Sequence, residues 1–224
     1  MISLFLILLI TPMVVSVDKL ADCLADDKYC VGLPRDCLGT ACNFQYSAKS
    51  NGKTAEIEIF GTKVQNREWL AIGYSDNKKM ENDFVMFCAR DDAKSSSPIA
   101  GLAYNQFHKN TVIGFIDNGL EHADNYSFDL KLLDFKVVND KLYCKLSHAV
   151  APLIENFNTT KYEILMAKGL MIKDALTYHS KAKADVGVVD LSGVKKQHKK
   201  NGATTGVTIL AAAISFIVYT ISSS

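Results

Sequence analysis

A period of two in the hydrophobic pattern constrains this chain more than any other feature of its sequence. In the stretch TAEIEIFG, residues 54–61, apolar and polar side chains alternate from Ala55 onward. Successive side chains of a β-strand point to opposite faces of a sheet, so this alternation is typical of a strand with one buried face. The pattern therefore predicts a strand over 54–61.

Further short runs rich in β-branched and aromatic residues are also expected to be strands. They are EWLAIGYS at 68–75, DFVMFCAR at 83–90, NTVIGFID at 110–117 and YEILMAKGL at 162–170, which we expect to end at Gly169. Residues 130–148 are expected to form a hairpin, with Asn139-Asp140 as its turn. Short strands with regular turns and little helical pattern predict an all-β fold, an antiparallel β-sandwich in which each sheet buries one face.

Apolar segments at both ends of the chain indicate the secretory pathway. Residues 2–15 are apolar and lead into small residues, which predicts a signal peptide over 1–16. No Lys or Arg precedes this run, and a buried first helix is the alternative interpretation. Between the ends we expect one domain over 42–191, preceded by a Cys-rich segment over 17–41.

The C-terminal end has the organisation of an attachment signal for a glycosylphosphatidylinositol (GPI) anchor. A polar, basic spacer at 192–205 precedes a hydrophobic tail at 206–224. Small residues, a spacer and a terminal apolar tail form the GPI pattern, with Ser192 or Asn201 as the attachment residue. The alternative is a short transmembrane anchor, although such anchors usually carry basic residues on the cytoplasmic side. Both alternatives predict a domain at the cell surface, on the extracellular face of the plasma membrane.

Charge and cysteine content limit the partners and the compartment. The 25 basic and 24 acidic residues nearly balance, so nothing in the total suggests nucleic acid as a partner. The basic run KKQHKK at 195–200 is interpreted as part of the spacer, with affinity for anionic lipid as the alternative. Asn125 and Asn158 begin N-x-S/T sequences and are candidate glycosylation sites.

Six cysteines in a secreted chain are expected to form disulfides. Two of them, Cys88 and Cys144, lie on predicted strands, and we pair them with each other. For the remaining four we prefer two bridges, of three possible connectivities, over a zinc knuckle; they are Cys23, Cys30, Cys37 and Cys42.

Met80 stands between Lys79 and Glu81 in a polar loop that joins two apolar strands. A thioether in such a loop gains little from packing unless it points inward. The surrounding stretch WLAIGYSDNKKMENDFVMFC, with KLYCKLSH, EILMAKGL and LTYHSKA further on, resembles the DOMON domain. The resemblance covers about residues 42–191. DOMON domains occur in dopamine β-monooxygenase, in ferric-chelate-reductase-like proteins and in the cytochrome part of cellobiose dehydrogenase.

The resemblance implies an immunoglobulin-like β-sandwich and a specific cofactor. Haem-binding members hold a b-type haem between a Met of this loop and a late His, which Met80 and His179 match. Asp83 matches the acidic residue that follows the Met, and Cys88 and Cys144 match a family disulfide. A Met–His pair fills both axial positions of haem iron and raises its potential. The implied role is one-electron transfer.

Several other interpretations stay open. Other DOMON domains bind no haem, and the alternative they imply is a ligand-binding or protein-interaction module. Copper held by Met80 and His179 is a third hypothesis, weakened by the small number of ligands. We assign other methionines to the core and other histidines to solvent, namely Met86, Met166, Met171, His108, His122, His148 and His198.

No catalytic triad, HExxH motif, P-loop or dinucleotide fingerprint is present, and neither a cytochrome b561 unit nor a flavin domain follows. We therefore expect no enzyme, but the electron-transfer half of a reductase system. Its partner would be a separate redox protein or surface ligand, together with the membrane to which the C-terminal segment anchors it.

Overall fold

The computed structural model describes residues 23, 28–94, 98–106, 109–116, 129–150, 160–179 and 183–192. Within these ranges the chain forms two antiparallel sheets and no α-helix. Two short 3-10 turns, Gly39–Ala41 and Asp92–Lys94, are the only helical elements among the described residues. None of the described segments is a helix long and apolar enough to cross a membrane. The predicted all-β, antiparallel sandwich is confirmed.

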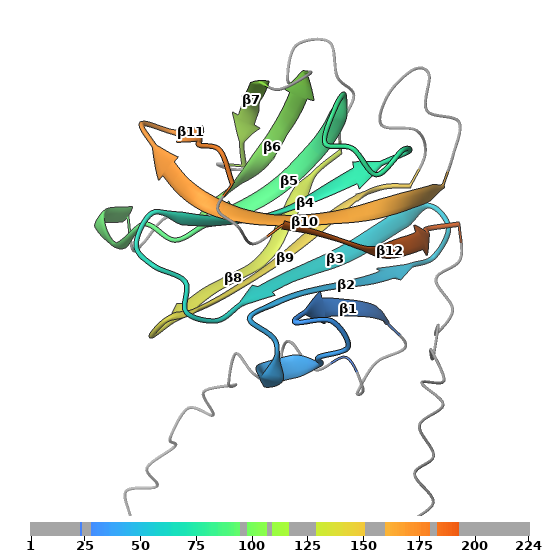
Figure 1. Ribbon diagram of the computed structural model, residues 1–224, viewed down its shortest axis with the longest axis horizontal. Helices are drawn as coiled ribbons and strands as arrows, with labels where there is room; N and C mark the ends of the chain where they lie inside the picture. Colours follow the sequence, from blue (N-terminus) through green and yellow to red (C-terminus); the bar gives the residue numbers. More distant parts are fainter. Residues whose placement is uncertain are drawn as a thin grey trace, which may run out of the picture.

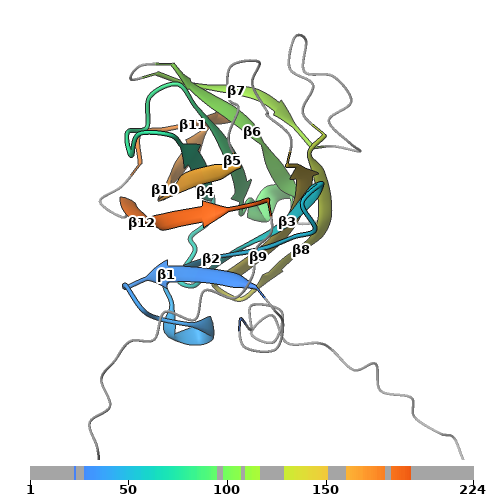
Figure 2. The ribbon, with the colours of Figure 1, turned by 90° about the vertical axis from the view of Figure 1, so that its right-hand side faces the viewer.

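The sheets stack as two layers, which Figure 2 shows with β1 and β2 at the bottom and β6 and β7 at the top. The five-stranded sheet has the order β1 (Tyr29–Leu33), β2 (Phe44–Ser50), β3 (Thr54–Gly61), β9 (Lys141–Ala149) and β8 (Lys131–Val138). The seven-stranded sheet has the order β11 (Ala175–Leu176), β10 (Lys161–Ile172), β4 (Glu68–Ser75), β5 (Asp83–Ala89), β6 (Ile99–Gln106) and β7 (Lys109–Phe115). Its last strand, β12 (Lys183–Asp190), also pairs with β10 (Figure 1).

The main core lies between the two sheets. Ile57 and Ile59 of β3 point into it from one side, and Leu70 and Ile72 of β4 point into it from the other. These side chains alternate along their strands as the period of two requires. The Cys88–Cys144 disulfide joins β5 to β9 and thus ties one sheet to the other across this core.

The seven-stranded sheet also buries its outer face, so the prediction that each sheet buries one face is wrong for it. Every residue of β4 and β5 is buried. An outer apolar cluster covers this face, made of Trp69, Ala71, Val85, Phe87, Ala89, Ile99, Ala103, Ala167, Met171 and Leu176. Leu176 of β11 is part of this cluster, and Met80 packs against it from the loop between β4 and β5. A nearly continuous apolar run such as EWLAIGYS is the signal of a strand buried on both faces.

Strand β10 does not end at Gly169, as predicted, but continues to Ile172. Gly169 pairs with Trp69 of β4, and the strand keeps its ladder past this point. Glycine is required here for space rather than for a turn, because a β-carbon at Gly169 would lie 2.7 Å from the Trp69 ring.

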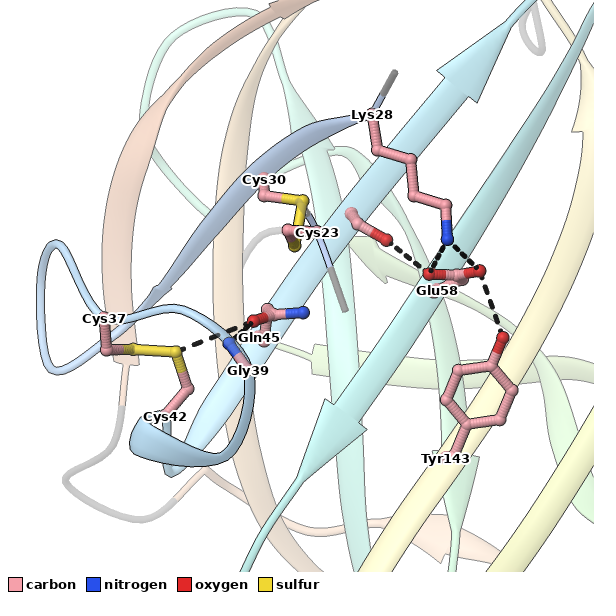
Figure 3. Close-up of a disulfide and its surroundings, with 10 residues drawn as sticks. Cys23, Lys28, Cys30, Cys37, Gly39, Cys42, Gln45, Glu58 and Tyr143 are labelled. Carbon is pink, nitrogen blue, oxygen red and sulfur yellow. Dashed lines mark hydrogen bonds and ion pairs between the residues drawn. A yellow bond between two sulfur atoms is a disulfide. The ribbon is translucent and has the colours of Figure 1, made fainter. Parts of the chain in front are cut away.

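The N-terminal segment is part of the five-stranded sheet. Cys23 pairs with Cys30 and Cys37 with Cys42, which is one of the three possible connectivities (Figure 3). Strand β1, which comes from the segment before Cys42, pairs with β2.

A buried cluster around Glu58 fastens the N-terminal segment to β3 and β9. Lys28 Nζ donates to both Glu58 carboxylate oxygens at 2.9 and 3.0 Å, and the hydroxyls of Ser47 and Tyr143 donate at 2.7 and 3.0 Å (Figure 3). All the charge in this cluster is paired, as burial requires.

Candidate functional site

A cavity of about 500 Å³ opens on the outer face of the seven-stranded sheet. Its apolar lining includes Trp69 of β4, Val85 of β5, Leu165 of β10 and Leu176 of β11. The cavity is therefore built against the outer apolar cluster and lies outside the sandwich core. Its size is within the range of pockets that hold cofactors and drug-sized ligands.

Met80 reaches this cavity from the loop 76–82, which joins β4 to β5. The Ser75 hydroxyl donates to the Lys79 carbonyl at 2.9 Å, and the Lys79 amide donates to Asn77 Oδ1 at 2.9 Å. These bonds fold the loop back toward the sheet. The Met80 side chain is partly buried, packs against the outer apolar cluster and lines the cavity.

His179 reaches the same cavity from the segment that follows β11. Strands β10 and β11 form a hairpin whose turn residues, Lys173 and Asp174, have φ angles of 49° and 61°. Positive φ at both central residues is the mark of a type I′ turn, which folds β11 back beside β10. Thr177 then donates from its amide and its hydroxyl to the Leu170 carbonyl, at 3.0 and 2.6 Å.

Gly169 and Trp69 determine how close His179 comes to the sheet. A β-carbon at Gly169 would lie 3.2 Å from the His179 Cα, so the backbone at His179 packs directly on β10. The Trp69 indole N–H donates to the Leu170 carbonyl at 2.9 Å and holds the ring against the same strand. On the other side, the exposed Tyr178 ring lies 4.3 Å from the His179 ring, measured between centroids. The structure thus brings Met80 and His179 to one cavity from separate loops.

A polar row crosses the outer face at the end of the sheet nearest the Met80 loop. Asp83 of β5 pairs with Asn105 of β6, which pairs with Asn110 of β7. Asn110 Nδ2 donates to Asn105 Oδ1 at 2.6 Å, and both asparagines line the cavity. Among the described residues, Asn110 Oδ1 has no hydrogen-bond donor. The cavity therefore combines an apolar floor with an edge that offers a hydrogen-bond acceptor.

Asp83 is the most unusual residue of this row. It is 1% exposed, and neither carboxylate oxygen finds a donor within the described part of the chain. Burial raises the pKa of Asp83 to about 7, and the nearby carboxylates of Asp76 and Glu81 add to the rise, while Ser75 opposes it. Sequence reasoning matched Asp83 to a family position but missed its burial. Its place at the first position of an apolar strand was the available signal.

Among the histidines, His148 corrects the sequence analysis, which assigned it to solvent. Its side chain is 1% exposed and lies between the sheets, where Nε2 is 3.1 Å from the Tyr74 hydroxyl. Burial lowers the pKa of His148 to about 4, so the ring is neutral at physiological pH. His148 pairs with the core residue Ala55 of β3, so its side chain faces the core. The Tyr74 hydroxyl supplies the polar partner that makes this burial possible.

The remaining predictions fall into two groups. Met86, Met166 and Met171 are buried, which confirms their assignment to the core. Ser192 is exposed in the turn after β12, where its hydroxyl donates to Asp190 at 2.7 Å. The other predicted features lie outside the described residues, namely the signal peptide, the hydrophobic tail, Asn125, Asn158, Asn201, His108, His122 and His198.

Fold and site together define an all-β sandwich protein with a ligand-sized cavity on an outer sheet face, lined by a methionine and a histidine. No protein-family model matches the chain. The chain is 48% identical over 203 residues to the Caenorhabditis elegans protein named "Uncharacterized protein C44B7.5", which covers 88% of this chain and 86% of that relative. It belongs to the family of this nematode protein.

A more distant similarity links the chain to a Drosophila melanogaster protein named "Putative ferric-chelate reductase 1 homolog". The two are 24% identical over 179 residues, which is 74% of this chain but 25% of that relative. The chain therefore spans about a quarter of the length of the fly protein. Together with three disulfides, this similarity indicates a protein of the extracellular space or the secretory pathway.

Proposed function

We propose that this protein is an extracellular, membrane-anchored DOMON domain that binds b-type haem between Met80 and His179 and transfers single electrons. The observation that carries the proposal is the convergence of these two side chains on one cavity. They are far apart in the sequence: Met80 lies in the loop between β4 and β5, and His179 lies in the segment after β11. The distant similarity to the fly ferric-chelate reductase homolog supports the same class of protein.

The residues of the cavity fit a haem group. Trp69, Val85 and Leu165 offer an apolar surface for the faces of a porphyrin, while a thioether and an imidazole supply soft and borderline iron ligands. Lys79 at the cavity wall can pair with the acidic groups of such a ligand. When bound, haem with Met and His ligation supplies one-electron chemistry at a raised potential.

The chain's own residues would hold and orient the group rather than act on a substrate. His179 is set on Gly169, and Met80 is held by the loop that Ser75 and Asn77 fold. Because Met80 and His179 would both be engaged in holding the haem, we assign the protein no enzymatic step of its own. It would serve as the electron-transfer half of a reductase system, with a separate redox partner.

The test is the visible absorption spectrum of the purified full chain, produced in a secretory host with haem supplied. The proposal expects a Soret band that sharpens on reduction and disappears in Met80→Leu and His179→Ala. Met80→Leu keeps side-chain volume while removing the thioether. Met171→Leu, the same change at a buried methionine that does not line the cavity, is the control and should retain the spectrum. Folded protein that stays colourless after haem titration would refute the proposal.

A second candidate is a non-redox binding module for a small ligand or a surface protein. The unsatisfied acceptor of Asn110 at the cavity favours a ligand that carries hydrogen-bond donors. This module would fold normally, stay colourless and bind its ligand independently of the Met80 thioether. Met80→Leu separates the two functions, because it would remove haem binding but leave ligand binding by this module unchanged.

Anchoring through a GPI group at Ser192 or Asn201 completes the proposal. Ser192 ends the described part of the chain in an exposed turn, where attachment would leave the sandwich close to the membrane. Release of the protein from cells by a phosphatidylinositol-specific phospholipase would support the lipid anchor, and retention would support a transmembrane one. Glycosidase treatment of Asn125→Gln and Asn158→Gln variants tests the glycosylation sites.

A further inference from the structure

We propose that Ser75 and Asp83 form a protonation-controlled latch on the loop 76–82, which carries Met80 over the cavity. In the closed state the Asp83 carboxyl is neutral and the Ser75 hydroxyl holds the loop. The inference concerns regulation of the proposed haem site and takes its biological meaning from that function. The latch itself is a property of the chain alone and can be measured without haem.

The first observation is that Asp83 is buried beside two acidic residues, and Ser75 is the neighbour that acts to stabilise its ionised form. It points to the outer face, as Val85 and Phe87 do further along β5, and it is 1% exposed. Neither of its oxygens has a donor among the described residues. An ionised carboxylate is disfavoured in such a place, because the single hydroxyl of Ser75 does not make up for the water that the carboxylate has lost.

The charges that face Asp83 reinforce this conclusion. The loop itself brings Asp76 and Glu81, both acidic, and β6 brings the neutral Asn105 opposite. On β10, the charged residue Glu163 pairs with Ser75 in the ladder. Lys78 Nζ lies 3.5 Å from the Glu163 carboxylate. Lys78 is itself largely exposed and is engaged there rather than at Asp83.

The second observation is that Ser75 has one hydroxyl proton to donate and several acceptors within reach. Its side chain is fully buried, and its hydroxyl donates to the Lys79 carbonyl at 2.9 Å, with Asn77 Oδ1 further away at 3.3 Å. Tyr74 pairs with Phe84, so the next position of the ladder places Ser75 opposite Asp83. A hydroxyl can donate only one hydrogen bond at a time.

Ionisation of Asp83 therefore changes the bonding of the loop. The proton leaves the carboxyl for solvent, and the Ser75 hydroxyl turns from the Lys79 carbonyl to the carboxylate. The Lys79 carbonyl immediately precedes Met80, so its release loosens the segment that delivers the thioether. Low pH closes the loop over the cavity, and higher pH opens it.

The experiment measures hydrogen exchange of the loop amides 76–81 in the purified, haem-free chain from about pH 5 to about pH 8.5, corrected for intrinsic exchange. One proton controls opening, so protection should fall roughly tenfold for each pH unit above the midpoint. Asp83→Asn cannot ionise and should stay protected throughout. Ser75→Ala should be unprotected throughout. Fluorescence of Trp69, the single tryptophan and a cavity residue, gives an independent readout.

Asp185→Asn is the matched control, because Asp185 lines the same cavity and faces the loop through Lys78, but its side chain is 36% exposed. It should titrate like the natural chain. Loop protection that does not change with pH in the natural chain would overturn the latch, whatever the variants do. So would an Asp83→Asn profile that matches the natural one. A colourless protein with a working latch would refute only the haem proposal, and a haem protein with a pH-independent loop would refute only the latch.

Discussion

Gly169 shows how a single residue without a side chain can position His179, the proposed haem ligand. The Trp69 ring and the His179 backbone both pack on the space where its β-carbon would be. The requirement is steric, because Gly169 is not among the glycines with positive φ. A site that depends on such close approach is sensitive to the addition of one methyl group.

We therefore expect Gly169→Ala to weaken haem retention while leaving the sandwich folded. The added carbon would lie 2.7 Å from the Trp69 ring and 3.2 Å from the His179 Cα, so both must shift outward. Overpacking of this kind costs about 1–3 kcal/mol. Haem titration monitored by the Soret band, together with thermal unfolding, measures the two effects separately.

Gly73→Ala is the control for this change, because a β-carbon there meets its nearest neighbour, Leu165, at 3.6 Å, an ordinary contact. Gly73 lies on the same face of the same sheet. Equal haem affinity in both variants would show that His179 is not positioned through Gly169.

Among the elements, the β10–β11 hairpin contributes most to the site for its size. Strand β11 has only two residues, yet its turn directs the chain back over the outer face and leads to His179. The turn uses Lys173 and Asp174 in left-handed conformations, which are costly for residues with a β-carbon. Asparagine and glycine adopt such angles more readily.

The double variant Lys173→Asn, Asp174→Gly should accordingly raise the free energy of unfolding by about 1 kcal/mol, since it relieves two strained residues. The site should be unaffected, because the hairpin register stays the same. Urea unfolding and the haem spectrum provide the two measurements. A loss of haem with raised stability would mean that Lys173 or Asp174 itself takes part in the site.

The same elements show why the fold could largely be predicted and the site only in part. Alternation identified β3 and the hairpin of β8 and β9, because apolar and polar residues alternate in their sequences, although β9 has no exposed residue and β3 is exposed only near its start. It could not show that β4 is buried on both faces, since that depends on which distant segments cover the outer side. Strand β11 is too short to carry any pattern at all.

Residue identity was informative where a side chain is out of place in its local sequence. Met80 was conspicuous as an apolar residue in a polar loop, and the resemblance suggested His179 as its partner. Asp83 and His148 gave weaker signals, because their burial is produced by strands far away in the sequence. Local polarity alone assigned His148 to solvent.

Across the whole molecule, a chain of polar side chains links the two sheets inside the core. The hydroxyl of Tyr46 on β2 lies 3.0 Å from that of Tyr74 on β4, which lies 3.1 Å from His148 on β9. The Cys88–Cys144 disulfide makes a second connection between the sheets. Protonation of His148 would place a charge in the middle of this structure.

Stability of the whole molecule should therefore fall in acid. The pKa of His148 drops from 6.5 to about 4 on folding, so its contribution is complete above pH 6.5 and is lost progressively as the pH falls toward 4. The expected loss is roughly 3 kcal/mol. His148→Gln, which retains an acceptor for Tyr74, should flatten this part of the profile of melting temperature against pH.

Asp83 acts in the opposite direction, because its pKa rises on folding from 3.8 to about 7. Its contribution to stability is complete below pH 3.8 and is lost as the pH rises through 7. Asp83→Asn in the same melting experiment separates the two groups. An acid loss that persists unchanged in His148→Gln would assign it to other groups.

The position of the cavity on the outer face has a consequence for how this architecture can evolve. Apart from Met166, the side chains that pack between the two sheets are not those that line the cavity. Substitutions at Met80 or His179 can therefore accumulate without eroding the sandwich. Members of such a family could lose the binding of one ligand and later gain the binding of another. Folding stability and secretion would remain under selection throughout.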